Sequence, residues 1–329
     1  MSTSYLQALL DGPEFESPNP EVLYERLERE EAELEEALLE ACDTDPVVGL
    51  RVAPLLQRFW FARGRLERGR AWVERLLASA GDAPTVDRAR GLSAAAALAF
   101  RQGDNDATRR YASEARELAL EQRASEVQID AALALARVGL RDGNVANVRR
   151  FSEEAREVAL ELGDEARELR ALHHLAEGTR IAGDHAHARG LYEESLARNR
   201  ARGSRVEVSV ELTNLATLDK TEGNFEQAEA NLCEAIEISQ EIGNSYVLAA
   251  NLVVLGVVAA AAGQPERATR FLGHADAIYS ATGLVIDPAD KPEYDNAVAV
   301  ARSALGEKRF AAAHARGAEM PVELLLERD

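Results

Sequence analysis

The sequence is poor in several residue types, and each scarcity excludes a class of protein. Aromatic residues make up only 5% of the 329 positions and proline occurs 10 times, so neither a strand-rich fold nor a proline-rich linker is expected. Cysteine occurs only at Cys42 and Cys233, too far apart for a disulfide framework or a zinc site. What remains abundant is Ala, Leu, Glu and Arg, which favours an all-α protein.

Catalytic and nucleotide-binding motifs are also missing. We find no HExxH, GxSxG, CxxC or GxxxxGK[ST] pattern and no glycine-rich dinucleotide-binding turn. The only metal-like grouping is a set of four histidines, and the two that are adjacent diverge by about 100° on a helix. These histidines are His173, His174, His185 and His187. We therefore expect no catalytic residue, no metal and no cofactor, and a protein that is not an enzyme.

Negative charge dominates, but unevenly. The net charge is −19, and the segment from Glu14 to Asp45 holds 13 acidic residues against Arg26 and Arg29. Such a charge disfavours nucleic acid and anionic membranes as partners. The N-terminus has no basic region followed by an apolar one, and the apolar run Val247–Gly263 has no basic flanks. We expect a cytoplasmic protein in which that run is a buried helix.

Glycines recur at a nearly constant interval. They occupy positions 64, 103, 143, 183, 223 and 263, with spacings of 39, 40, 40, 40 and 40, each just after a helical apolar stretch. A glycine past a helix end accepts the left-handed conformation, and Asp or Asn beside it can cap the next helix. The pattern predicts six to seven helical hairpins. We expect a flexible segment at 1–19, an acidic cap helix at 20–45, six repeats at 46–285 and a capping hairpin with a tail at 286–329.

Within this lattice the residues resemble tetratricopeptide repeats (TPRs). The matching positions are Leu215, Ala216, Gly223, Ala228 and Ala235, then Leu255, Gly256, Gly263, Ala268 and Ala275, and then Leu175, Gly183, Ala188 and Tyr192. The longer period resembles the sensor arrays of bacterial maltose-activator and antibiotic-regulator proteins, where the array follows a switch ATPase. The resemblance implies a TPR-like α-solenoid that forms a right-handed superhelix.

The resemblance also implies which side chains line a concave groove. In such arrays these are the residues thirteen, ten, six, three and two positions before the turn glycine. The resulting ligand-binding candidates are Arg58, Phe61, Arg101, Arg137, Arg141, Arg170, His173, Arg180 and Lys220, and the same columns contain Arg51, Arg90, Phe100 and Glu177. Arginine binds carboxylate or phosphate with a planar fork, so an anionic ligand is expected. The alternative is that these arginines only pair with glutamates on neighbouring helices.

Two segments admit more than one interpretation. In the sixth repeat the groove columns contain Ala250, Val253, Val257, Ala260 and Ala261, an apolar strip that must be covered. The C-terminal segment can cover it, as can a homodimer through Val253 and Val257 or an apolar ligand. The acidic segment is either an amphipathic cap with a solvated face or, together with residues 1–19, a pseudo-ligand for the basic groove.

We expect a non-catalytic sensor that binds a protein, a peptide or a small anionic effector in its groove. The resemblance implies a role in bacterial signalling or transcriptional regulation, with a switch ATPase or a transcription factor as partner. The alternative is a scaffold that holds two proteins and has no effector.

Overall fold

The computed structural model describes residues 3–12, 21–287 and 290–327. The chain divides into two compact units, unit 1 (Met1–His174) and unit 2 (Leu175–Asp329), and each is described by itself. The described residues form helices and no strands, which confirms the all-α prediction. No helix among them is both long and apolar enough to cross a membrane.

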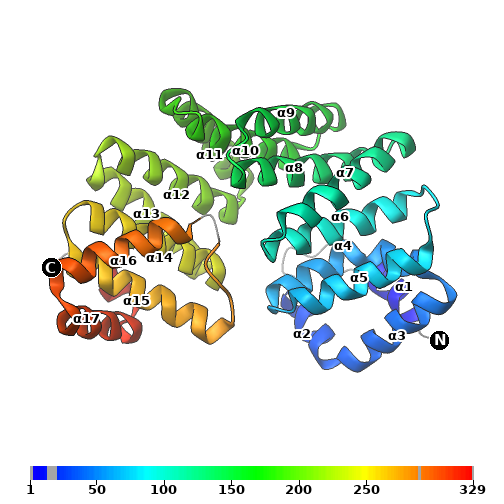
Figure 1. The fold of residues 1–329 in the computed structure, drawn as a ribbon, viewed down its shortest axis with the longest axis horizontal. Helices are drawn as coiled ribbons and strands as arrows, with labels where there is room; N and C mark the ends of the chain where they lie inside the picture. Colours follow the sequence, from blue (N-terminus) through cyan, green and yellow to red (C-terminus); the bar gives the residue numbers. More distant parts are fainter. Residues whose placement is uncertain (1–2, 13–20, 288–289, 328–329) are drawn as a thin grey trace. The chain divides into compact units, whose positions relative to one another are not determined.

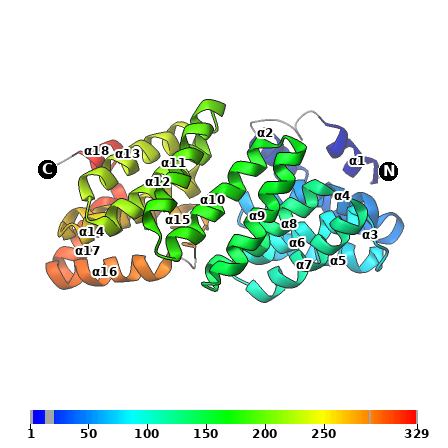
Figure 2. The ribbon, with the colours of Figure 1, turned by 90° about the horizontal axis from the view of Figure 1, so that it is seen from above.

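Unit 1 begins with a cap and continues with hairpins. The cap is α1 (Thr3–Asp11), α2 (Glu21–Arg29) and α3 (Glu31–Thr44). The hairpins are α4 (Pro46–Ala62) with α5 (Leu66–Ala80), α6 (Val86–Arg101) with α7 (Asn105–Gln122), and α8 (Ser125–Arg141) with α9 (Val145–Leu162), and α10 (Glu165–Ile181) follows. Figure 2 shows these hairpins in sequence order, from α4 to α9.

Unit 2 contains the later repeats and the C-terminal helices, beginning within α10. After α10 comes α11 (His185–Arg202), and α12 (Arg205–Glu222) then packs on α13 (Phe225–Glu241), as α14 (Ser245–Ala261) does on α15 (Pro265–Thr282). The chain then forms α16 (Lys291–Leu305), α17 (Glu307–Glu319) and α18 (Val322–Leu326). The predicted count of repeats is confirmed, because six hairpins lie between α4 and α15.

The turn glycines take the predicted conformation. Gly223 has a φ of 81°, and no atom lies within 4 Å of where its Cβ would be, so only the backbone conformation requires glycine there. The capping prediction is confirmed where Asp104, Asn144 and Asp184 each accept a hydrogen bond from the backbone N–H three residues later. It is wrong at Asn224, whose side chain caps nothing.

The N-terminal segments differ from expectation in two places, while the expected domain boundaries stay a prediction. The acidic segment is two helices, α2 and α3, because the first ends at Arg29. Within the segment expected to be flexible, α1 packs on α3 and α4 and buries Leu6 and Leu9. Two leucines on one helical face provide enough apolar area to dock a short helix. Residues 13–20 lie outside the described part.

The apolar strip of the sixth repeat is covered from within unit 2. Val253 and Val257 of α14 are only 2% and 8% exposed, and Val257 packs with Leu272 of α15 and Ala297 of α16. The C-terminal segment therefore covers the strip at Val257, with Ala260 at the edge of the contact, whereas Ala261 stays exposed. Dimerisation through Val253 and Val257 stays a prediction, and in this structure both side chains are covered within the chain.

Candidate functional site

The first helices of successive hairpins in unit 1 share one face. α4 packs directly against α6, and α6 packs against α8, so the ends of these helices come together at the turns. We call the surface formed by α4, α6, α8 and residues 165–174 of α10 the A-helix face of unit 1. It carries most of the residues that the repeat columns single out.

Arginine and phenylalanine side chains stack along this face. The guanidinium carbon of Arg101 lies 4.2 Å from the ring centroid of Phe61. Those of Arg137 and Arg141 lie 3.8 and 3.5 Å from the ring centroid of Phe100. Each contact joins one repeat to the next. We call this set the arginine–phenylalanine ladder; its members are Phe61, Phe100, Arg101, Arg137 and Arg141. Stacking on a ring holds a guanidinium group in one orientation. Its N–H groups point outward in the guanidinium plane, so they can still bind an anion there.

Phe100 is the fixed centre of the ladder. Its side chain is only 5% exposed, so its ring cannot move away from the two guanidinium groups. Arg141 also donates a hydrogen bond of 2.6 Å from Nη1 to the backbone carbonyl of Phe100, whereas Arg137 lies one helical turn earlier on α8. The ladder therefore concentrates three positive charges in a chain whose net charge is −19.

Several basic residues on the same face form ion pairs with carboxylates. Arg170 pairs with Asp130 of α8 at 3.2 Å. Arg51 and Arg90 both pair with Asp87, at 2.9 and 2.7 Å. Burial alone would raise the pKa of Asp87, but the hydrogen bonds from the two arginines outweigh it and hold that pKa below its usual range. For these side chains the ion-pair interpretation holds.

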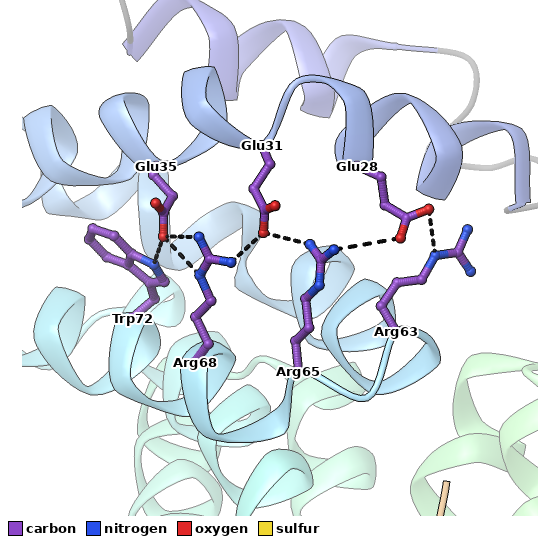
Figure 3. A network of polar contacts seen from close by, with 7 residues as sticks. All are labelled: Glu28, Glu31, Glu35, Arg63, Arg65, Arg68 and Trp72. Carbon is purple, nitrogen blue, oxygen red and sulfur yellow. Dashed lines mark hydrogen bonds and ion pairs between the residues drawn. The ribbon is translucent and has the colours of Figure 1, made fainter. Parts of the chain in front are cut away.

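The acidic cap has its own basic partners, which Figure 3 shows. Glu28 pairs with Arg63 at 3.0 Å, and Arg65 pairs with Glu31 at 2.6 Å. Arg68 bridges Glu31 and Glu35, and Glu35 also accepts a hydrogen bond from the indole N–H of Trp72. Arg63 and Arg65 lie in the turn between α4 and α5, and Arg68 lies on α5. None of the three belongs to the ladder. The described acidic residues of α2 and α3 therefore stabilise the cap, which favours the cap interpretation over the pseudo-ligand.

In unit 2 the two predicted site residues face the chain's own acidic segment. Lys220 of α12 pairs with Glu293 of α16, with its Nζ 2.6 Å from Oε2. Arg180 of α10 lies close enough to Asp290 to influence its ionisation. Desolvation by the surrounding protein raises the pKa of Asp290 to about 6, and the carboxylates of Asp287, Glu177 and Glu293 add to the effect, although the residue as a whole is exposed to solvent, which weakens the shift.

Ionised Asp290 should therefore weaken the attachment of α16 at neutral pH. Because its pKa in the folded chain lies above the ordinary 3.8, the stabilisation from its protonated form is complete below that value and is lost as the pH rises through about 6. We expect Asp290→Asn to slow hydrogen exchange of the α16 amides at pH 7 by about 5-fold. A 5-fold change corresponds to about 1 kcal/mol, which is less than the full pKa shift would give because solvent screens the charge of Asp290.

Asp295→Asn is the matched control, because Asp295 lies on α16 with 56% of its side chain exposed and pairs only within that helix, with Lys291. Equal exchange rates for the Asp290→Asn and native chains at pH 7 would contradict the prediction. The two chains should converge below pH 4, where Asp290 is protonated in both states.

Comparison with solved structures identifies the fold. Aspartyl phosphate phosphatase F from Bacillus subtilis superimposes with a TM-score of 0.60 at 12% identity, over 98% of this chain and 87% of that one. A Rap protein complexed with Competence and Sporulation Factor matches with a TM-score of 0.57 at 13% identity, over 99% of this chain and 95% of that one. A signal-transduction ATPase with a TPR sensor from Pyrococcus horikoshii matches with a TM-score of 0.56 at 15% identity, over 93% of this chain and 47% of that one.

The chain has a TPR-like fold. It is an all-α solenoid like the sensor array of that ATPase. At such low identity the likeness concerns the fold alone. No protein-family model matches the sequence, and no curated protein is significantly similar to it in sequence.

The nine predicted site residues thus fall into separate groups on the TPR-like array. Phe61, Arg101, Arg137 and Arg141 are brought together in the ladder. Arg58 is exposed on α4 and makes no ion pair with a described residue. His173 stacks edge-on against His174, with ring centroids 5.2 Å apart. Arg170 is paired within unit 1, while Arg180 and Lys220 face α16 in unit 2.

The sequence interpretation missed the acidic side of the unit 2 site. Asp287, Asp290 and Glu293 lie where Arg180 and Lys220 were expected to meet an outside ligand. The available signal was the run DPADKPEYD, in which acidic residues outnumber the basic Lys291 just before a helix. It also missed a cavity of about 290 Å³ between α13, α14 and α15, whose wall includes Phe225, Leu255 and Phe271.

Proposed function

We propose that the A-helix face of unit 1 binds a protein or peptide partner through the partner's carboxylates or other anionic groups. The observation that carries the proposal is the arginine–phenylalanine ladder, which fixes three guanidinium groups on successive helices of one face. Pre-ordered arginines lose less side-chain entropy on binding than freely rotating ones. The ladder runs across repeats, so it suits an extended ligand better than a single small ion.

Two structural relatives support a regulatory role for this binding. One is a Rap protein in complex with a named factor, and another is a signal-transduction ATPase in which a TPR array is the sensor. By analogy, we propose that the chain acts without catalysis in bacterial signalling, in the cytoplasm. Occupancy of the ladder would then be passed to a partner ATPase or a transcription factor. In a narrower form of this proposal, the ligand of the ladder is a small anionic effector.

The test is peptide selection followed by affinity measurement. Peptides selected from a random library on the native chain at physiological ionic strength should be enriched in Asp and Glu. We expect Arg137→Gln and Arg101→Gln each to weaken their binding about 10-fold, or about 1.4 kcal/mol. Arg137→Lys keeps the charge but loses the planar fork, so its loss should be nearly as large.

The control is Arg149→Gln, which removes the same charge from α9, where the side chain is 75% exposed and pairs only with Glu153. It should leave the affinity unchanged within about 2-fold. If acidic peptides bind the ladder variants and the native chain equally, the ladder is a structural stack and the scaffold interpretation is preferred.

A further inference from the structure

α16 packs on α14 and α15 and reaches α12 through one ion pair, between Glu293 and Lys220. We call the surface formed by residues 175–181 of α10, together with α12 and α14, the A-helix face of unit 2. Figure 1 shows α16 in orange alongside α14 and α15. Ala297 sits on Val257 and Leu272, with Ala260 of α14 at the edge. The chain's own helix therefore occupies the face on which a solenoid of this type would receive a ligand.

One ion pair joins the start of α16 to this face. Glu293 of α16 pairs with Lys220, whereas Asp290 is influenced both by Arg180 and by the like charge of Glu177 on the same face. Lys220 is largely enclosed, with 15% of its side chain exposed, whereas 58% of the Glu293 side chain is exposed. Lys220 is thus a fixed part of the A-helix face of unit 2, and the Glu293 carboxylate belongs to a helix that lies on this face.

α16 is weakly held for a helix of its length. Among its residues only the small side chains of Ala297 and Ala301 are buried, while Tyr294 and Val298 are half-buried against α14 and α15. The carboxylates of Asp287, Glu293 and Glu177 surround Asp290, so several negative charges share one end of the contact. Its specific polar contacts with the rest of unit 2 include the Lys220–Glu293 pair and a hydrogen bond of 2.7 Å from the Tyr294 hydroxyl to Asp276 of α15.

We propose that the A-helix face of unit 2 is a second binding site, occupied here by α16, whose ligand is an acidic, alanine-containing helix of a partner protein that displaces α16. Glu293, Ala297 and Ala301 are four residues apart and lie on one side of their helix. A partner helix with a carboxylate and two alanines at this spacing would pair with Lys220 and fit against Val257. Larger side chains at the alanine positions would not fit without moving α14 and α15 apart.

This site is independent of the ladder, because it uses different residues in a different unit. The covalently attached α16 acts as a competitor at high effective concentration, so an outside helix binds well only when α16 is weakened. The site is therefore regulated by its own occupant. Binding of the partner would release residues 290–305 to solvent, where they are available to another protein.

The test uses the full chain and a labelled synthetic peptide with the sequence of residues 290–305. Ala297→Asp places a carboxylate on Val257 and should expel α16, so the peptide should bind that variant at least about 10-fold more tightly than the native chain. Glu293→Lys weakens α16 without touching the apolar contact and should act in the same direction. Ala299→Asp is the matched control on the exposed side of α16 and should change nothing.

A second change identifies the binding face. Adding Lys220→Glu to the Ala297→Asp chain should weaken peptide binding about 10-fold again, whereas adding Arg101→Gln of the ladder should not. The proposal is overturned if neither weakened variant, folded by circular dichroism, binds the peptide better than the native chain. A concentration-dependent dimer of the native chain that Lys220→Glu abolishes would also overturn it, by assigning the face to α16 of a second copy.

Discussion

An alanine at position 317 is expected to separate α17 from α15. A Cβ at Gly317 would lie 2.0 Å from the carbonyl oxygen of Arg270 and 2.6 Å from its carbonyl carbon. On the other helix, a Cβ at Gly273 would lie 2.2 Å from the carbonyl oxygen of His314. Both obstacles are backbone atoms, which cannot rotate away as a side chain can. The two helices must therefore move apart, and α17 must give up part of its burial.

We expect Gly317→Ala to destabilise the C-terminal helices by about 3 kcal/mol, even though alanine favours a helix by about 0.5 to 1 kcal/mol over glycine. Hydrogen exchange of the α17 amides measures this directly and does not require the whole array to unfold in one step. Protection there should fall by about 100-fold, with little change in α4 to α9.

Gly190 provides the matched control. It lies on α11, is exposed, and has no atom within 4 Å of where a Cβ would be, so Gly190→Ala should be neutral or slightly stabilising. Native protection of α17 in the Gly317→Ala chain would show that the helices can part without loss, and the close approach would then have no energetic role.

The hairpins could be predicted because their signal is local. A glycine such as Gly223 is needed for a single backbone conformation, and that requirement appears directly in the sequence at every repeat. The break between α2 and α3 could not be predicted. No glycine or proline marks it, and the leucine spacing continues across Arg29 and Glu30.

The candidate site was only partly predictable, because a side chain's partner depends on packing between repeats. The repeat columns indicate Arg101, Arg137 and Arg141 as neighbours, and the structure adds that Phe61 and Phe100 hold them. The pairing of Arg170 with Asp130 was within reach, since the two are one repeat length apart. The pairing of Lys220 with Glu293 was not, because α16 lies outside the repeat and no period relates the two residues.

Asn251 is the one polar residue in the apolar run of α14, and its replacement should have a large cost. Its side chain is 2% exposed. The amide nitrogen donates to Ser209 and Ser239 at 2.9 and 3.0 Å, and the amide oxygen accepts from Thr213 at 2.7 Å. One side chain thus joins α12, α13 and α14, and α14 is one of the two helices on which α16 packs. Removing it takes one hydrogen-bond partner from the buried hydroxyls of Ser209 and Ser239 and from the half-buried hydroxyl of Thr213, although all three keep a bond to a backbone carbonyl.

We expect Asn251→Leu to lower the free energy of unfolding by about 3 kcal/mol, although leucine fills a similar volume and suits the apolar run better. The same change combined with Ser209→Ala and Ser239→Ala should recover most of the loss, because removing both sides of a buried hydrogen bond is far cheaper than removing one. Denaturant unfolding followed by hydrogen exchange in α12 to α14 measures both variants.

The control for this pair is Asn214→Ala on α12, where a half-buried amide donates only to the carbonyl of Val210 in its own helix. Its cost should stay below about 1 kcal/mol. If the triple variant is no more stable than Asn251→Leu alone, unsatisfied hydroxyl groups are not the cause of the loss. The amide would then act by fixing the register of α14 against α12 and α13, and with it the position of Val257 beneath α16.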